Sequence, residues 1–420
     1  MEIRRDALLK RLMDLRHNGM IKVITGMRRC GKSYLLFKLF SEALKAEGVS
    51  DEHIVMVNLE DRRNKVLRDP DKLLEYIDSR LKDDQMHYVL LDEVQLVSDF
   101  EDVLNSYLQV KNADLYVTGS NARFLSKDIV TGFRGRGFEI KVHPLSFLEI
   151  RNARPDEPVE NLWVEYMTYG GLPQVVTMTS TQEKVVYLKS LFKHTYLKDI
   201  KERYDIKLDG DLEELISTLA STVGGLTNPR KLADTFRTVK KSAISQDTIK
   251  VYIDYLQDAF IIERALRYDI KGRRYIDTPS KFYFEDLGLR NALLNFRQVE
   301  KTHLMENAIY NELRARGMAV DVGEVFWNTK DEDGKKIRKI LEVDFVCNQG
   351  YKRAYIQSAF SIPDDTKRDQ ELQSLRRIDD SFQKVVIIGD HSPCYQNEDG
   401  ILFIDIYDFL LDKESINSAG

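Results

Sequence analysis

The octapeptide GMRRCGKS, Gly26–Ser33, constrains this chain more than any other stretch of it. It follows the apolar run IKVIT and opens a segment with helical spacing, so a strand, a glycine-containing turn and a helix succeed one another. In that context the spacing GxxxxGKS predicts a phosphate-binding loop (P-loop), in which backbone N–H groups converge on phosphate oxygens at a helix N-terminus. The sequence therefore predicts a nucleotide site.

The individual positions of the loop have separate chemical roles. We expect Lys32 to reach the β and γ phosphates and the Ser33 hydroxyl to ligate Mg²⁺. The two loop arginines cannot both point at phosphate, and Cys30 fits as a small residue packed below the loop, with a redox role as the alternative. The predicted nucleotide contacts in this stretch are Gly26, Met27, Arg28, Arg29, Cys30, Gly31, Lys32, Ser33 and Tyr34.

A second apolar run, YVLLDE, ends in the two carboxylates Asp92 and Glu93. An Asp at this position can hold Mg²⁺ through water, while the adjacent Glu orients and deprotonates the attacking water. The pair therefore favours hydrolysis of ATP over binding alone. The alternative is a solvated acidic strand end.

Two further stretches offer groups for the γ-phosphate. LYVTGSNARF ends a β run with Thr118, Ser120 and Asn121. Ser120 or Asn121 could sense that phosphate or hold the water, or these residues could simply form a turn. TGFRGRGFEI offers Arg134 and Arg136, and we expect Arg136 in particular to neutralise transition-state charge. Such an arginine can come from a neighbouring subunit, which would require an oligomer; a solvated loop arginine is the alternative.

Apolar runs alternate with helical spacing from Ile21 to about Ile150, as in a parallel sheet covered by helices. The candidate strands are IKVIT, HIVMVNL, YVLLDE, DLYVTGS and GFEIKV. The polar, proline-containing stretch RNARPDEPVEN follows and marks a boundary. We therefore place a three-layer α/β domain at residues 1–150.

Residues 151–272 predict a mostly helical domain, and its clearest helix carries a Ser245 cap. The apolar face of that helix comprises Ile249, Ile253, Leu256 and Phe260. The strand-like FIIERALRYDI follows, so the order of elements is that of a winged helix. Residues 273–420 alternate the β runs KFYFE, KILEVDFVC, RAYIQSAF and KVVIIGD with the helix LMENAIYNELRARG, which predicts another α/β domain.

With these motifs together, the chain resembles the prokaryotic AAA-type ATPases whose C-terminal half is a domain of unknown function built from a winged helix and a restriction-endonuclease-like fold. The likeness is carried by ITGMRRCGKSYLL, YVLLDEVQ, LYVTGSNARFLS, GRGFEIKVHPLSFLE, YGGLPQVV, YLKDIKERYDI, ENAIYNEL and LEVDFV. It implies a P-loop NTPase core of the additional-strand class, with an extra strand between the P-loop strand and the Asp92 strand. It also implies that Lys32 and Ser33 bind ATP and Mg²⁺ and that Asp92 holds the metal. Glu93 is then the base and Arg136 the arginine finger.

Nucleases of that fold bind metal through a helix Glu, a strand Asp and a following strand with Glu/Asp-x-Lys. Glu306 and Asp344 match the first two, but Gln357 and Ala359 stand where the third element needs a carboxylate and a lysine. A neutral amide is a poor Mg²⁺ ligand, and metal-assisted hydrolysis needs both charge and orientation. We therefore expect an inactive nuclease-like domain, in which Glu306, Glu342 and Asp344 make structural contacts or bind a partner.

Nucleic-acid binding by the winged-helix region is open. Its second helix has Lys250 as its only cation beside three aspartates, which would repel phosphates in a major groove. Cations available for backbone contacts lie elsewhere: Arg230, Lys231, Arg237, Lys240, Lys241, Lys271, Arg273 and Arg274. A solvated face on a winged helix used for protein contact is the alternative.

Composition limits the remaining function classes. Lys+Arg 63 against Asp+Glu 68 gives a net charge of -5, which is not the signature of a dedicated nucleic-acid binder. Three dispersed cysteines and the lack of a signal-like or membrane-spanning run predict a cytoplasmic protein. We expect ATP hydrolysis to drive rearrangement of the C-terminal domains, on nucleic acid in one version. The alternative is a nucleotide-gated scaffold or sensor that recruits a protein, and a third interpretation is an active nuclease.

Overall fold

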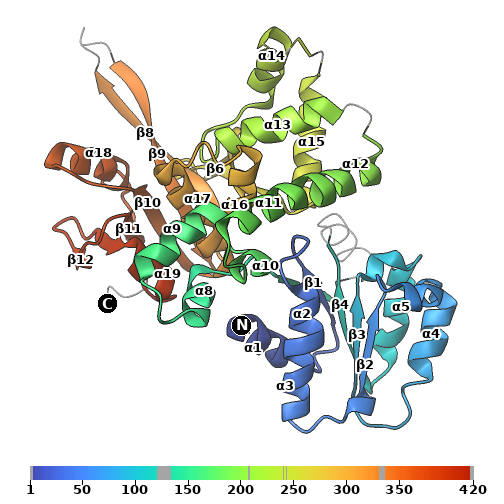
Figure 1. The fold of residues 1–420 in the computed structure, drawn as a ribbon. Helices are drawn as coiled ribbons and strands as arrows, with labels where there is room; N and C mark the ends of the chain where they lie inside the picture. Colours follow the sequence, from blue (N-terminus) through green and yellow to red (C-terminus); the bar gives the residue numbers. More distant parts are fainter. Residues whose placement is uncertain are drawn as a thin grey trace. The chain divides into compact units, whose positions relative to one another are not determined.

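The computed structural model describes residues 3–120, 133, 135–206, 209–239, 241–242, 244–330 and 336–416. The chain divides into two compact units (Figure 1). Unit 1 comprises Met1–Leu145, Leu172–Thr177 and Asp258–Phe260. Unit 2 comprises Ser146–Gly171, Met178–Gln257 and Ile261–Gly420.

Unit 1 is built on a five-stranded sheet with the order β2-β3-β4-β1-β5, and every pairing in it is parallel. The strands are β1 (Ile21–Thr25), β2 (Ile54–Asn58), β3 (His87–Asp92), β4 (Ala113–Thr118) and β5 (Gly137–Lys141). All five predicted strands are therefore present. β4 lies between β1 and β3, which confirms the extra strand that the resemblance implied.

Helices connect these strands and cover the sheet, so that β1 and β3 are buried along their whole length. They are α1 (Asp6–Asp14), α2 (Lys32–Tyr34), a π-helical segment (Leu35–Phe40), α3 (Ser41–Ala46), α4 (Pro70–Asp78) and α5 (Phe100–Ser106). The short α10 (Pro173–Val176) also belongs to unit 1. Local sequence sets the start of α4, because Asp69 accepts from the Lys72 N–H and Pro70 stands at the first helical position.

The helices of unit 2 precede and flank its sheet. They are α8 (Phe147–Ala153), α9 (Val159–Tyr169), α11 (Thr181–Leu191), a π-helical segment (Phe192–Leu197), α12 (Lys198–Tyr204), α13 (Asp209–Ser221), α14 (Pro229–Val239), α15 (Gln246–Asp258), α16 (Leu287–Leu293), α17 (Lys301–Ala315), α18 (Asp365–Leu375) and α19 (Ile406–Leu411). Ser245 caps α15, as predicted, by accepting from the Thr248 N–H at 3.0 Å. Phe260 lies beyond the end of that helix with φ 55°, so it does not continue the helical face.

The sheet of unit 2 is mixed and has the order β12-β13-β11-β10-β9-β8-β6-β7. Its strands are β6 (Ile262–Asp269), β7 (Arg274–Phe284), β8 (Ala319–Lys330), β9 (Lys336–Gln349), β10 (Lys352–Ala359), β11 (Gln383–Ile388), β12 (Tyr395–Gln396) and β13 (Leu402–Asp405). The chain therefore contains the further α/β domain that the sequence predicted.

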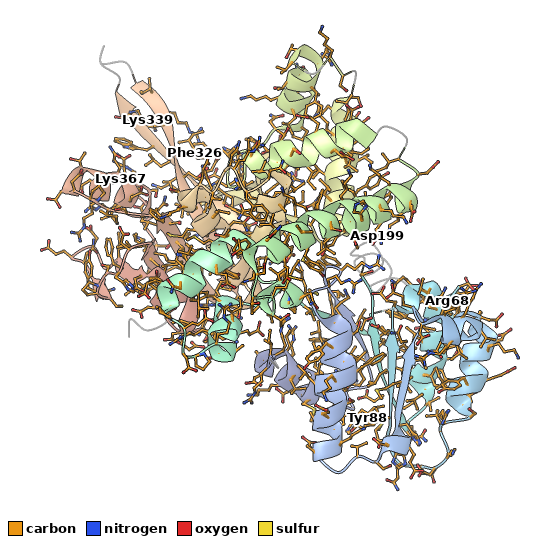
Figure 2. The ribbon with its side chains drawn as sticks, viewed as in Figure 1. Arg68, Tyr88, Asp199, Phe326, Lys339 and Lys367 are labelled. Carbon is orange, nitrogen blue, oxygen red and sulfur yellow. The ribbon has the colours of Figure 1, made fainter. Side chains whose placement is uncertain are left out.

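The predicted β-ribbon is the antiparallel pair β6–β7, and it joins the large sheet because β6 also pairs with β8. The boundary proposed at residues 272 and 273 lies in the turn between these two strands. The neighbouring β8–β9 hairpin, marked by Phe326 and Lys339 in Figure 2, extends away from the sheet. Among the helices of the described ranges, none combines the length and the low polarity needed to cross a bilayer.

Candidate functional site

The P-loop connects the end of β1 to a continuous helical stretch that begins at Lys32. Its two glycines have positive φ angles, 138° for Gly26 and 100° for Gly31, a region that side chains disfavour. A Cβ added to Gly26 would lie 2.1 Å from the Val142 carbonyl oxygen. The tight loop thus depends on glycine at that position, as the motif predicted.

The Lys32 side chain lies inside the loop and is 5% exposed. Its ammonium donates to the carbonyl oxygens of Gly26 at 2.9 Å and Met27 at 3.0 Å. The loop backbone therefore holds the cation where the motif expects the phosphates to be wrapped.

Side chains from the P-loop helix and from β4 contact the Asp92 carboxylate at the end of β3. Its Oδ1 accepts from the Ser33 hydroxyl at 3.0 Å and from the Thr118 hydroxyl at 2.5 Å. Burial raises the pKa of Asp92, while these two hydrogen bonds act in the opposite direction. A hydroxyl and a carboxylate oxygen side by side are the hard oxygen ligands that Mg²⁺ prefers, so the residues present fit that ion.

Glu93 directly follows β3 and has a left-handed backbone conformation, with φ 56°. Its N–H donates to the Thr118 hydroxyl at 3.0 Å. Its carboxylate accepts from the Ser120 hydroxyl at 3.1 Å and from the Gln95 amide. The structure thus brings Ser120, one of the residues predicted near the γ-phosphate, to Glu93.

Two members of this network had no specific role in the sequence prediction, which named Thr118 only as part of the strand end and did not name Gln95. Thr118 is the last residue of β4, and its place at the carboxyl end of a strand next to β3 was the available signal. Gln95 offered no comparable pattern, because its contact with Glu93 arises within a short irregular turn. Asn121 and Arg134, both named as candidates, lie outside the described residues.

The remaining loop residues face different surroundings. Arg28 pairs with Glu60 at 2.8 Å, and Arg29 is exposed. Cys30 is buried, consistent with the packing role expected for it, and its carbonyl accepts from Arg5 at 3.2 Å. Tyr34 is 43% exposed at the start of the helix.

Arg136 lies at the amino-terminal ends of the parallel strands, whereas the P-loop lies at their carboxyl ends. Its carbonyl accepts from the N–H of Ile21, the first residue of β1, at 2.9 Å. The P-loop begins after Thr25, the last residue of that strand, so the length of β1, about 13 Å, separates Arg136 from the start of the loop. The structure therefore does not bring the exposed Arg136 to the loop of its own chain.

A second cluster of charges lies in unit 2, around the ammonium of Lys281 on β7. The Lys281 Nζ lies 2.7 Å from Glu342, 2.9 Å from Glu306 and 3.8 Å from Asp344. Burial opposes the charge on Lys281, but the three carboxylates outweigh it and raise its pKa. Tyr283 also donates to Glu306, at 2.7 Å.

The stretch that was compared with the third nuclease element forms β10, beside this cluster. The Ser358 N–H donates to Asp344 at 2.8 Å, and Gln357 donates to Glu371 at 3.3 Å. Ala359 is buried at the end of the strand. The cation among the carboxylates is therefore Lys281, which sequence reasoning missed because it comes from a different strand.

The basic groups named for nucleic acid are spread over several elements. Arg230, Lys231, Arg237 and Lys241 are exposed on or after α14, and Lys240 lies outside the described residues. Lys271 pairs with Asp379 at 3.1 Å, and Arg274 pairs with Asp269 at 3.6 Å. These ion pairs reduce the positive charge offered by the β6–β7 turn.

Comparison with known proteins gives matches along most of the chain. Residues 18–151 match the family model of an AAA domain, and residues 160–300 match a domain of unknown function (DUF8612). An uncharacterized protein of Haemophilus influenzae is 34% identical over 415 residues, which cover 97% of this chain and 98% of that protein. An uncharacterized protein of Methanocaldococcus jannaschii is 25% identical over 386 residues, covering 87% and 84%. Among solved structures, a Walker-type ATPase of Pyrococcus abyssi is similar with a TM-score of 0.50 and 14% identity, covering 70% of this chain and 96% of that one.

Proposed function

The chain belongs to the family of the uncharacterized Haemophilus influenzae protein and carries an AAA domain on a P-loop NTPase fold, and from this premise we propose that it binds ATP with Mg²⁺ and hydrolyses it. One observation carries the proposal. The Ser33 and Thr118 hydroxyls converge on Asp92 while Glu93, the next residue, is held by Thr118 and Ser120. Two groups suited to Mg²⁺ and a positioned carboxylate thus lie together where the start of the P-loop helix meets the ends of β3 and β4.

Each residue of the site has one task in this proposal. Ser33 and Asp92 would hold Mg²⁺, which neutralises charge on the phosphate oxygens when it is bound. Lys32 exchanges its two loop carbonyls for phosphate oxygens. The Glu93 carboxylate takes the proton of the attacking water, and Ser120 keeps that carboxylate in position.

We assign Arg136 to the site of a neighbouring subunit. Its distance from its own P-loop leaves it unable to reach a phosphate bound there, whereas its exposure allows contact across an interface. An arginine finger supplied in trans is worth several orders of magnitude in turnover. The protein would then act as an oligomer.

The C-terminal part of the chain is proposed to be nuclease-like but inactive. The succession α17-β8-β9-β10-α18-β11 supports this likeness, with Glu306 on the helix and Asp344 on a central strand. The Lys281 ammonium lies among the carboxylates that would have to bind a metal ion. Because a second cation there would meet that positive charge, we infer that the domain binds a partner and does not cut nucleic acid.

A winged helix is proposed for the region that begins at residue 151, with α14, α15 and β6 within residues 151–272 and β7, directly after them, as the second strand of the ribbon. ATP turnover at the P-loop would then drive rearrangement of the two C-terminal regions. A specific observation favours a second candidate, a nucleotide-gated scaffold for another protein: α15 exposes Asp247 and Asp254, which would repel nucleic acid.

Turnover of ATP by purified protein, with and without Mg²⁺, tests the enzymatic proposal. Lys32→Ala and Glu93→Gln should each lose most activity, whereas Lys45→Ala, an exposed lysine on α3, should keep it. Equal activity in all three variants would rule the assignment out. Glu93→Gln protein loaded with ATP can then be used to capture partners, because co-purifying nucleic acid supports the first candidate and a discrete protein supports the scaffold.

A further inference from the structure

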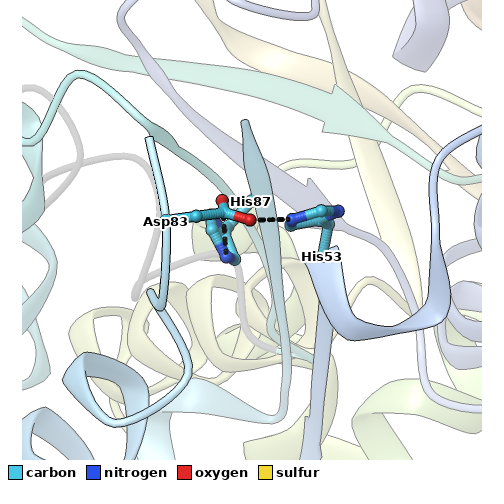
Figure 3. A group of neighbouring side chains, drawn as sticks. All are labelled: His53, Asp83 and His87. Atoms are coloured by element: carbon cyan, nitrogen blue, oxygen red, sulfur yellow. Dashed lines mark hydrogen bonds and ion pairs between the residues drawn. The ribbon is translucent and has the colours of Figure 1, made fainter. Parts of the chain in front are cut away.

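We propose that His53, Asp83 and His87 form a binding site for one Zn²⁺ ion in unit 1. Each residue offers one ligand atom, and the three atoms all lie within 4.8 Å of one another. Figure 3 shows the three side chains pointing toward one another from separate segments of the chain.

Parallel strand pairing brings the two histidines together. His53 ends a short 3-10 helix (Asp51–His53) directly before β2, and His87 is the first residue of β3. Ile54 and Tyr88, the residues that follow them, are register partners. Asp83 comes from the turn before β3, and its backbone carbonyl accepts from Asn112 at 2.7 Å. Three segments therefore place the ligands at the amino edge of the sheet.

The distances fit a tetrahedral zinc ion. The His53 Nε2 lies 3.0 Å from one carboxylate oxygen of Asp83, and the His87 Nε2 lies 3.8 Å from the other. Ligands at 2.0–2.1 Å from Zn²⁺ stand about 3.3 Å apart in a tetrahedron. The two histidine–aspartate distances bracket this value and all three ligand atoms lie within 4.8 Å of one another, so adjustment of the side chains would bring them around one ion.

The outer hydrogen bonds orient both imidazoles as ligands. The His87 Nδ1 lies 2.8 Å from the Gln85 carbonyl oxygen, which can only accept, so this nitrogen carries the proton. The other ring nitrogen, Nε2, faces the Asp83 carboxylate at 3.8 Å and is the atom that a metal ion would bind. The Ser50 hydroxyl lies 2.7 Å from the His53 Nδ1 and can accept from it, which would free the His53 Nε2, hydrogen-bonded to Asp83, for the metal ion.

The two histidines are buried, and the types of ligand favour zinc. His53 is 7% and His87 1% exposed, whereas the Asp83 side chain is 44% exposed and leaves a path for water as the fourth ligand. Two imidazoles and one carboxylate suit Zn²⁺, whereas Mg²⁺ prefers oxygen ligands alone. His87 and Asp92 stand at opposite ends of β3, so this site is separate from the proposed nucleotide site. Bound zinc would fasten the starts of two adjacent strands.

Zinc titration of chelator-treated full-length protein tests the proposal, by calorimetry and by the shift in melting temperature. We expect one Zn²⁺ per chain, a higher melting temperature with Zn²⁺ than with Mg²⁺, and at least a tenfold loss of affinity in His87→Gln and Asp83→Asn. His194→Gln, an exposed histidine of unit 2, is the matched control and should bind zinc like the wild type.

Asp83→Asn keeps the shape of a half-exposed side chain, so it remains informative if a histidine variant fails to fold. Wild-type protein that binds no zinc would show that the cluster is only a hydrogen-bonded network and would overturn the proposal. Undiminished binding in folded Asp83→Asn protein would do the same.

Discussion

The Ser33 hydroxyl lies 3.0 Å from the Asp92 carboxylate, so the P-loop and the end of β3 are hydrogen-bonded to each other. Thr118 donates to the same carboxylate oxygen from β4. Three elements that the sequence separates widely are thereby held in one arrangement. Hydrogen bonds within the protein thus hold the groups proposed to bind Mg²⁺ in position, which reduces the reorganisation that catalysis would need.

The Thr118→Val substitution hardly changes the volume of the side chain, but it is expected to disrupt this arrangement. It removes the donor to Asp92 and leaves the Glu93 N–H without its hydroxyl acceptor. We expect a loss of about 1–3 kcal/mol in the free energy of unfolding and a turnover lower by about tenfold or more. Denaturant unfolding and ATPase assays measure both. Thr118→Ser retains the hydroxyl and should preserve most of each quantity.

Replacement of Lys281 by Met is expected to destabilise unit 2 severely. Without the ammonium, Glu306, Glu342 and Asp344 would be left as neighbouring carboxylates with no cation among them. Loss of one partner of a buried ion pair costs about 3–5 kcal/mol. Lys271→Met, at an exposed ion pair with Asp379, should cost less than about 1 kcal/mol. Equal unfolding midpoints for the two variants would contradict the role given to Lys281.

Asp344 should make the stability of the protein depend on pH. Burial, with the nearby Glu306 carboxylate, raises its pKa to about 7 against the pull of Lys281. The folded state therefore binds more protons than the unfolded state between the ordinary aspartate pKa of about 4 and about pH 7. The contribution of Asp344 to the free energy of unfolding consequently falls as pH rises through that window.

Asp344→Asn cannot ionise, and its amide oxygen can still accept from the Ser358 N–H. We expect its melting temperature, relative to wild type, to rise from about pH 5 to about pH 8, by the equivalent of about 1 kcal/mol or more. Thermal melts in matched buffers measure this difference. A difference that stays constant across the range would mean that Asp344 is not the titrating group.

Arg136→Ala is expected to lower turnover by at least about tenfold while nucleotide binding persists, because an arginine finger acts mainly on the transition state. The assignment to a neighbouring subunit predicts complementation. Arg136→Ala and Lys32→Ala proteins, each defective alone, should regain activity when mixed, because one supplies an intact P-loop and the other an intact arginine. Arg63→Ala, with an 89% exposed side chain, is the control. Mixtures no more active than their parts would argue against action in trans.

Much of unit 1 could be predicted because its signals are local. Each strand is a short apolar run, and the spacing of Gly26, Lys32 and Ser33 fixes a loop whose geometry depends on adjacent residues. Asp92 and Glu93 are neighbours in the sequence, so their pairing needed no knowledge of the fold. The helix α15 ended before Phe260, because a positive φ angle stops the helical pattern that apolar periodicity alone would have continued.

By itself, the sequence determined the P-loop, the acidic pair and the parallel-sheet core, since residues close along the chain encode each of them. Only the tertiary structure decided which distant groups meet. Strand pairing placed Thr118 on Asp92, put Lys281 among the Glu306 and Asp344 carboxylates, and joined His53 to His87. Such contacts depend on the order and register of the strands. The same apolar periodicity is compatible with more than one order and register, so the periodicity alone does not specify which residues meet.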